Sequence, residues 1–299
     1  MAPKRVAGVQ EVASAYATLL LDQFGVLHDG RNAYTHALTA VEQLHRAGKH
    51  LIVLSNSGRR AAETTEKLAR LGFNKEHFTG AVTSGETTHE ALSTRADPLF
   101  ASLGRRCLNI NWADRGATPI DVDSYGIELV QDVDEADFIL AHGMEALSGA
   151  EPRRVTLEEL QALLRKAAER SLPLIIANPD VVTVDTTFLV PMPGQLGLWY
   201  EAMPGHGDIV LMGKPAGRIY DAAKRVLPDC AGAGRILAVG DSLAHDVKGA
   251  CAAGIDSLFV VHGIHKEELT PWSEDALRRR ANEHCDGHMP TFIVDDFSW

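Results

Sequence analysis

Short apolar segments that end abruptly in polar residues recur along this chain, and they restrict its fold more than any other feature. The apolar residues 19–21 are followed by Asp22, and residues 51–54 are followed by Ser55 and Asn56. Apolar runs of this length are typical of parallel strands that are covered on both faces. Segments with apolar residues at helical spacing separate these runs. We therefore expect an α/β fold in which parallel strands alternate with helices.

The first part of the chain predicts a regular order of strands and helices. Residues 35–47 and 59–71 each have a helical apolar pattern, and each is followed by a glycine, Gly48 and Gly72. Residues 81–83 predict a third strand. Right-handed crossovers would bring the carboxyl ends of the three strands to one edge of a Rossmann-like sheet, where open α/β sheets place their chemistry.

The middle of the chain has strands and helices of its own. Apolar runs predict strands at residues 107–111, 138–141 and 174–177, and a strongly periodic helix at residues 157–170. A segment with this content is an inserted domain and not a loop. We expect residues 1–86 and 194–299 to form the core domain and residues 87–193 to form an inserted α/β domain.

Further strand ends with reactive side chains follow the inserted domain. Lys214 comes after the apolar residues 209–212, and Asp241 ends the apolar residues 235–240. Asp246 lies one helical turn beyond Asp241, as expected if both carboxylates point to one place. The strand at residues 235–240 is apolar apart from its first residue, Arg235. Together with Asp22, Ser55 and Asn56, these residues predict a single site at the carboxyl edge of the core sheet.

The residue types at these strand ends fit the transfer of a phosphoryl group. The Asp22 carboxylate could attack phosphorus, and the negative charges of a phosphate monoester then require cations nearby. Lys214 would neutralise Asp22 and one phosphate oxygen. The Ser55 hydroxyl, Asn56 and backbone N–H groups such as that of Gly25 would bind the remaining phosphate oxygens.

The same site offers the oxygen ligands that Mg²⁺ prefers, and Mn²⁺ also suits such a site. We expect the carboxylates of Asp22 and Asp241 and the backbone carbonyl of Phe24 to contact the metal ion. Asp246 would hold a water molecule that is bound to the metal.

Composition excludes several other classes of protein. The 299 residues carry a net charge of −11, and no long block of Lys or Arg occurs, which argues against nucleic acid or an anionic membrane as a partner. Cys107, Cys230, Cys251 and Cys285 are widely scattered, which is typical of reduced thiols and predicts a cytoplasmic protein. The apolar runs are far shorter than a membrane span.

These motifs, in this order, resemble those of the haloacid dehalogenase superfamily. Residues 22–27 match its first motif, Ser55-Asn56 the second, Lys214 the third, and residues 240–242 with Asp246 the fourth. Residues 67–73, 83–86 and 177–180 are also similar to class IIA, the sugar-phosphatase, p-nitrophenylphosphatase and pyridoxal-phosphatase-like group.

The resemblance implies a magnesium-dependent hydrolase of small phosphorylated metabolites. It implies an aspartyl-phosphate intermediate on Asp22 and a cap domain at residues 87–193 that determines substrate specificity. It further implies a homodimer formed through the caps. Asn178 and Asp180, at the end of a cap strand, are expected to face the substrate or to form an Asx-Pro turn.

One residue departs from the motif. Phosphatases of this group have a second aspartate two residues after the nucleophile, which protonates the leaving alcohol, and here that position is Phe24. Such a general acid contributes about 10²–10⁴ in rate. His28 and Asp29 are the nearest titratable residues that could transfer a proton in its place.

The missing aspartate leaves two alternatives to an ordinary phosphatase. The first is cleavage of a carbon–halogen or carbon–phosphorus bond, because related enzymes with those activities also lack this aspartate. The second is a catalytically weak protein that binds or senses a phosphorylated metabolite.

Overall fold

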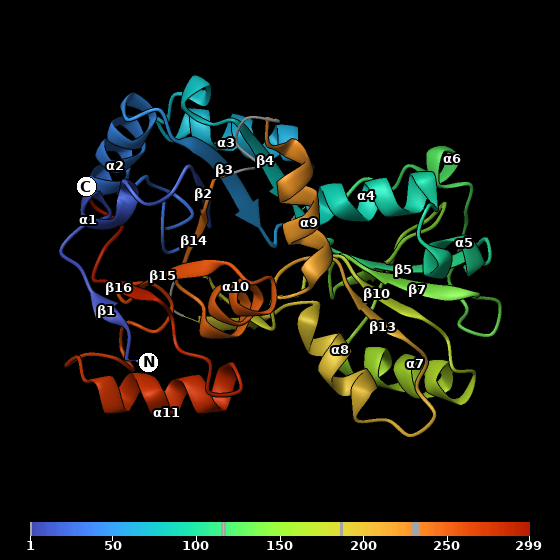
Figure 1. Cartoon of the computed structure of the whole chain (residues 1–299). Helices are drawn as coiled ribbons and strands as arrows, with labels where there is room; N and C mark the ends of the chain where they lie inside the picture. Colours follow the sequence, from blue (N-terminus) through green and yellow to red (C-terminus); the bar gives the residue numbers. More distant parts are fainter. Residues whose placement is uncertain (1, 115, 117, 186–187, 229–233) are drawn as a thin grey trace. The chain divides into compact units, whose positions relative to one another are not determined.

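The computed structural model describes two compact units, each built from an α/β sheet (Figure 1). The first unit comprises Met1–Ser55, Ala61–Thr83 and Lys214–Trp299, and the second comprises Asn56–Arg60 and Ser84–Gly213. The predicted α/β fold class is confirmed. The described residues are 2–114, 116, 118–185, 188–228 and 234–299, so that Cys230 lies outside them.

The first unit contains a parallel sheet of seven described strands. All neighbouring pairs are parallel. In spatial order the strands are β1 (Lys4–Arg5), β16 (Phe292–Val294), β15 (Asp256–Val260), β14 (Ile236–Gly240), β2 (Thr18–Leu21), β3 (His50–Ser55) and β4 (Gly80–Thr83).

Helices cover both faces of this sheet, which explains why consecutive residues inside its central strands are apolar. Leu19 and Leu21 belong to a buried cluster with residues of α1 (Gln10–Ala13) and α2 (Thr35–Arg46). Leu20 lies on the opposite face, in a cluster with residues of α9 (Gly217–Val226) and α10 (Lys248–Ala252). The helical segments of the first unit are α1 (Gln10–Ala13), α2 (Thr35–Arg46), α3 (Ala61–Arg70), the 3₁₀ turn η1 (Lys75–His77), α9 (Gly217–Val226), the π-helical turn η2 (Leu243–Val247), α10 (Lys248–Ala252) and α11 (Glu274–His284).

The second unit contains a mixed sheet and a separate hairpin. The sheet runs through β13 (Ile209–Leu211), β10 (Leu174–Ile176), β7 (Phe138–Ala141), β5 (Arg106–Asn111), β8 (Ala146–Leu147) and β9 (Arg153–Arg154), with β6 (Glu128–Val130) also paired to β5. The strands β13, β10, β7, β5 and β6 are parallel to one another. The pairs β5–β8 and β8–β9 are antiparallel, so that β8 alone among the paired strands of this sheet that the structure describes runs in the opposite direction. The hairpin consists of β11 (Val182–Asp185) and β12 (Phe188–Pro191).

The second sheet is also covered on both faces. Residues of α7 (Leu157–Glu169) and α8 (Gly194–Glu201) pack on one face. Residues of α4 (Ser84–Thr94), α5 (Pro98–Ser102) and α6 (Val122–Tyr125) pack on the other. None of the helices in the described part of the chain has the length and apolarity needed to cross a membrane.

The structure corrects the predicted domain boundaries. Residues 194–213, expected in the core, belong to the second unit, because α8 packs on the second sheet and β13 pairs with β10. The strand before Lys214 is therefore a strand of the second sheet. At the other boundary, the second unit resumes at Ser84 and also contains Asn56–Arg60. The C-terminal residues contribute α11 and β16 to the first unit.

Helix α7 allows a test of the second core. Leu164 is fully buried, whereas Leu157 on the same helix is 45% exposed. We expect Leu164→Ala to lower the free energy of unfolding by about 2–5 kcal/mol, because it leaves a cavity. Leu157→Ala is the control and should change it by less than about 1 kcal/mol. Urea denaturation measures both values, and equal losses would contradict this packing.

Candidate active site

Three neighbouring strands of the first sheet bring polar side chains to one edge. The central strand β2 lies between β14 and β3, with Leu21 paired to Val239 and to Val53. Asp22 directly follows β2, Asp241 directly follows β14, and Ser55 is the last residue of β3. The Asp22 N–H donates to the carbonyl oxygen of Val239 at 2.9 Å, which continues the sheet to the site.

Lys214 is the centre of a buried ionic cluster in the first unit. Its ammonium nitrogen lies 2.8 Å from Oδ1 of Asp22 and 2.7 Å from Oδ1 of Asp246. The lysine is only 2% exposed. Both contacts are therefore charge-assisted hydrogen bonds that water screens little. The motifs predicted Lys214, Asp22 and Asp246 at one place, and the structure brings them together.

The pKa values in this cluster reflect burial opposed by the lysine. Burial raises the pKa of Asp22 to about 7, while the Lys214 charge acts in the opposite direction and Asp246 raises it further. Burial also raises the pKa of Asp241 well above its ordinary value, with additional repulsion from Asp22 and Asp246. Burial disfavours the charged form of Lys214, but the two carboxylates outweigh it and raise the lysine pKa.

Backbone groups hold two of the carboxylates in place. The N–H of Ile264 donates to Oδ2 of Asp241 at 2.7 Å, and the N–H of Ser242 donates to Oδ2 of Asp246 at 3.0 Å. A Cβ added at Gly263 would lie 2.2 Å from Oδ2 of Asp241, so glycine is required for this close approach. The carboxylates are thus fixed by the loops that follow β14 and β15.

The cluster fits a divalent metal ion. Carboxylate oxygens of Asp22, Asp241 and Asp246 all lie within 4.8 Å of one another. An all-oxygen donor set of this kind suits a hard cation such as Mg²⁺. The repulsion that raises the pKa values of Asp22 and Asp241 would be relieved by a bound cation.

Gly25 contributes to the site through its backbone shape. Its φ is +76°, and a Cβ at this position would lie 1.9 Å from Oδ2 of Asp241. Its N–H, which we predicted to bind phosphate, donates to the carbonyl oxygen of His28 at 3.0 Å. The role that the structure supports for Gly25 is therefore the close packing of the turn against Asp241.

Among the described residues, the acidic cluster of Asp22, Asp241 and Asp246 includes no carboxylate from the turn after Asp22. The Phe24 ring is 37% exposed and meets the His28 ring edge to face, with 6.4 Å between the ring centroids. The Asp29 carboxylate accepts from the N–H groups of Arg31 and Asn32 at 2.8 Å and 2.6 Å, and these bonds lower its pKa. Asp29 therefore forms a turn and remains ionised.

His28 is buried as a neutral ring. It is 2% exposed, and burial, reinforced by the charge of Lys67, lowers its pKa to about 4. Its Nδ1 accepts from the N–H of Gly30 at 3.0 Å, so the ring proton lies on Nε2. Nε2 is buried without a hydrogen-bond partner among the described residues. A neutral imidazole is a poor proton donor, so the structure gives no support to His28 as the replacement acid.

The predicted polar residues of the cap lie in the second unit with Asn56. The side chain of Asn56 donates to Oδ1 of Asp180 at 2.8 Å. Oδ1 of Asn178 accepts from the N–H of Asp180 at 3.0 Å, which is the Asx turn that the sequence left open as an alternative. Asp180 therefore holds the segment that follows Ser55.

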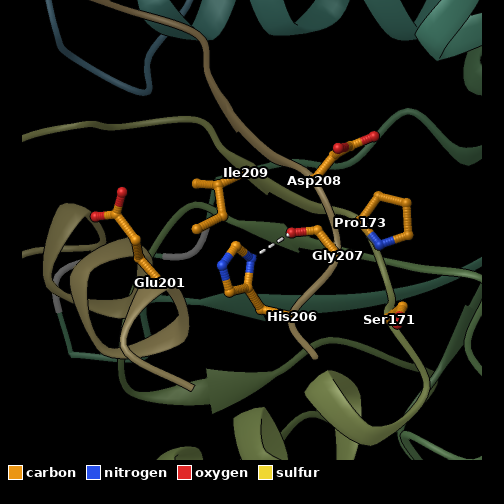
Figure 2. A pocket seen from close by; sticks show the side chains of 7 residues that line it. All are labelled: Ser171, Pro173, Glu201, His206, Gly207, Asp208 and Ile209. Carbon is orange, nitrogen blue, oxygen red and sulfur yellow. Dashed lines mark hydrogen bonds between the residues drawn. The ribbon is translucent and has the colours of Figure 1, made fainter. Parts of the chain in front are cut away.

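A separate cavity of about 460 Å³ lies in the second unit (Figure 2). Its lining consists of Ser171, Pro173, Glu201, His206, Gly207, Asp208 and Ile209. In Figure 2 the His206 ring donates toward the carbonyl oxygen of Gly207, at 2.8 Å. The cavity contains none of the predicted site residues.

Comparisons with known proteins agree with the motifs and the fold. Residues 19–114 match the family described as haloacid dehalogenase-like hydrolase, and residues 211–298 match the related family described as HAD-hydrolase-like. The chain belongs to the haloacid dehalogenase superfamily. It is a phosphatase-type hydrolase, and its similarity is to class IIA of that superfamily.

Individual members of the superfamily resemble the chain over almost its whole length. The D-glycerol 3-phosphate phosphatase of Mycobacterium tuberculosis is 27% identical over 290 residues, which cover 96% of this chain and 72% of that protein. A haloacid dehalogenase-like hydrolase from Brucella suis has a TM-score of 0.73 at 25% identity, with 98% of this chain and 99% of that one covered. The fold of a M. tuberculosis glycerol phosphate phosphatase in complex with magnesium is also similar, with a TM-score of 0.61 at 23% identity and coverage of 95% and 76%.

Sequence reasoning missed the residues that support Asp241. Ile264 and Gly263 lie in the segment after β15, which carries no motif. Both act through the backbone, one by an N–H group and the other by the absence of a side chain. In the sequence, the support of Asp241 by this segment is indicated only by Gly263, which lies just beyond an apolar strand.

The contact between Gly25 and Asp241 leads to a prediction about metal binding. We expect Gly25→Ala to weaken Mg²⁺ binding at least tenfold, because the new Cβ must displace Asp241. Gly48→Ala is a matched control, since Gly48 has a similar φ of +70° but no atom within 4 Å of its added Cβ. Both variants should lose about 1–2 kcal/mol of stability to backbone strain. Isothermal titration calorimetry measures the Mg²⁺ affinity of both variants, and equal affinities would contradict the prediction.

Buried His28 predicts a loss of stability in acid. The unfolded state binds a proton at this residue below about pH 6.5, whereas the native state does so only below about pH 4. Stability should therefore fall as the pH is lowered from 6.5 to 4, by up to about 3 kcal/mol from this residue. His28→Phe should remove that part of the pH dependence. Thermal unfolding between pH 4 and 8 tests this, and an unchanged profile in the variant would refute it.

Proposed function

We propose that this protein is a magnesium-dependent phosphatase of small phosphorylated metabolites and that Asp22 is its nucleophile. The observation that carries the proposal is the buried cluster in which Lys214 bonds to Asp22 and Asp246, with Asp241 beside them. Relatives named as phosphatases of glycerol phosphate support this substrate class.

Asp22 would form a bond from a carboxylate oxygen to phosphorus as the bond to the leaving oxygen breaks. The leaving alcohol takes up a proton, and water then cleaves the aspartyl-phosphate to release phosphate and restore the carboxylate. Lys214 holds Asp22 in position and offers positive charge to a phosphate oxygen. Ser55 and Asn56 would donate hydrogen bonds to the other phosphate oxygens.

A magnesium ion would be held by the carboxylates of Asp22 and Asp241 and the backbone carbonyl of Phe24, and by Asp246 through water. Bound there, the ion would supply positive charge that offsets the repulsion between the carboxylate and the phosphate. Mn²⁺ would suit the same oxygen donors.

Phe24 determines which esters this site would hydrolyse well. Among the described residues, no carboxyl group takes the place of the aspartate that Phe24 replaces. His28 is a neutral buried ring and Asp29 is an ionised turn residue, so neither is suited to protonate the leaving group. Leaving groups that depart as stable anions need no proton donor. We therefore propose a preference for activated esters and acyl phosphates over simple alkyl phosphates.

The alternative reactions have less support. Cleavage of a carbon–halogen bond does not need the third carboxylate, yet Asp246 is retained and bonded to Lys214. Cleavage of a carbon–phosphorus bond would need an additional lysine for a Schiff base. Lys166, a lysine of α7, lies on the solvent side with 60% of its side chain exposed.

Hydrolysis of p-nitrophenyl phosphate, acetyl phosphate and an alkyl phosphate tests this proposal. We expect magnesium-dependent turnover of the first two and turnover of the alkyl ester that is slower by about 10²–10⁴. Asp22→Asn should abolish all turnover, because an amide cannot attack phosphorus. Gly48→Ala serves as a control for mild destabilisation. Absence of turnover with all three esters would favour the catalytically weak binding protein instead.

A further inference from the structure

The segment of residues 261–270, in the first unit, contacts a candidate metal ligand by its backbone. It follows β15 and consists of consecutive turns and bends. The N–H of Ile264 donates to Oδ2 of Asp241 at 2.7 Å. Ile264 itself is 42% exposed, so the packing of its side chain does little to fix this N–H. The position of the donor must therefore be determined by its neighbours in the segment.

His265, the next residue, is buried and fixed by the backbone around it. It is 9% exposed, and its ring centroid lies 6.1 Å from that of Phe259 and 5.5 Å from that of His284. Its carbonyl oxygen accepts from the N–H groups of Glu268 and Leu269, at 3.1 Å and 3.0 Å. The chain thus turns back over His265 directly after the residue that bonds to Asp241.

The His265 ring closes this turn by a hydrogen bond to Glu268. Nδ1 of His265 lies 2.8 Å from Oε2 of Glu268. Burial lowers the pKa of His265 although Glu268 opposes this effect, so the ring is neutral at pH 7. Burial acts to raise the pKa of Glu268, but the bond to His265 outweighs it and the pKa is lowered. Nδ1 of a neutral ring therefore donates its proton to a carboxylate.

Helix α11 anchors the acceptor of this bond. Nε of Arg280 lies 3.3 Å from the same Oε2 of Glu268, and Nη1 of Arg280 donates to Oε2 of Glu283 at 2.8 Å. Leu269 is fully buried in a cluster that includes Leu277 of α11. The turn that presents the N–H of Ile264 is thus attached to a helix by one polar and one apolar contact.

The position of this turn matters because it is packed tightly against Asp241. A Cβ added at Gly263 would lie 2.1 Å from Cβ of Asp241, so the turn cannot shift toward this residue without moving it. A shift in the other direction would lengthen the bond from Ile264. An N–H that donates to a carboxylate stabilises its charged form, which is the form that binds a metal ion.

We propose that His265 is a positioning residue for the metal site, and that its hydrogen bond to Glu268 holds the N–H of Ile264 on Asp241. The proposal rests on the metal site of the proposed function. His265 acts on Asp241 through the backbone of its neighbour and does not contact the metal ion itself. Loss of the bond to Glu268 would loosen the turn, and Asp241 would become a weaker ligand.

Two substitutions at this position separate the hydrogen bond from the packing of the ring. His265→Phe keeps a ring beside Phe259 and His284 but cannot donate to Glu268. His265→Asn loses the ring but places an amide N–H where Nδ1 lies, and it serves as the rescue variant. His284→Phe makes the same exchange in the neighbouring ring and is the matched control. Thermal unfolding of each variant reports its loss of stability.

Isothermal titration calorimetry of the full chain with Mg²⁺ tests the proposal without any substrate. We expect His265→Phe to weaken Mg²⁺ binding about tenfold, as is typical when a group that supports a metal ligand is removed. His265→Asn should stay within about twofold of the wild type, even where it unfolds at a lower temperature than His265→Phe. His284→Phe should bind Mg²⁺ as the wild type does.

A substitution on the acceptor side keeps the test valid if changes at His265 impair folding. Glu268→Ala removes the acceptor at a side chain that is 38% exposed, and it should weaken Mg²⁺ binding about as much as His265→Phe. Glu267→Ala removes the same charge from the neighbouring residue and is its control. Because both substitutions break one bond, the double variant His265→Phe/Glu268→Ala should lose little more affinity than either single variant.

The other outcomes would overturn the proposal. Wild-type affinity in His265→Phe would show that the bond does not act on the metal site, and equal losses in His265→Phe and His265→Asn would assign the effect to the ring. Additive losses in the double variant, or no binding of Mg²⁺ by the wild-type chain, would also refute it. Failure of the proposed function is seen separately, as a wild-type chain that binds Mg²⁺ but does not hydrolyse p-nitrophenyl phosphate.

Discussion

The contact between the Lys214 ammonium and two carboxylates is the interaction on which the candidate site depends. Burying three carboxylates close together is unfavourable unless positive charge is buried with them. Lys214 provides it at 2.8 Å from Asp22 and 2.7 Å from Asp246. With that charge in place, the first sheet can bring Asp22 and Asp241 to adjacent strand ends. A metal ion would complete the neutralisation that one lysine begins.

The position of Lys214 in the chain links this cluster to the second unit. Residues 209–211 pair with β10 in the second sheet, and Lys214 follows after only two further residues. Ser55 has a similar position, since it ends a strand of the first sheet and the next five residues belong to the second unit. Lys214 and Ser55 are therefore both connected in the chain, over a few residues, to the second unit.

Much of the fold and the centre of the site could be predicted from the sequence. Strands that are covered on both faces have continuous apolar sequences, and for this reason β2, β3 and β14 could be predicted. Asp22, Lys214 and Asp241 could be predicted because reactive side chains follow apolar runs at these positions. The assignment of β13 to the core was wrong, because an apolar run does not indicate which of two parallel sheets it joins. The role of Ile264 could not be predicted, since any residue type carries a backbone N–H.

The division of the chain also limits how such proteins can be recombined. The chain passes between the two units at four places, after Ser55, Arg60, Thr83 and Gly213. A chimaera that exchanged only residues 84–213 would combine the 56–60 segment of one parent with the second sheet of another. The bond from Asn56 to Asp180 and the close approach of Gly85 to Gly58 would then join residues of different origin. A chimaera that preserves these contacts therefore requires the short segment to be moved together with the large one.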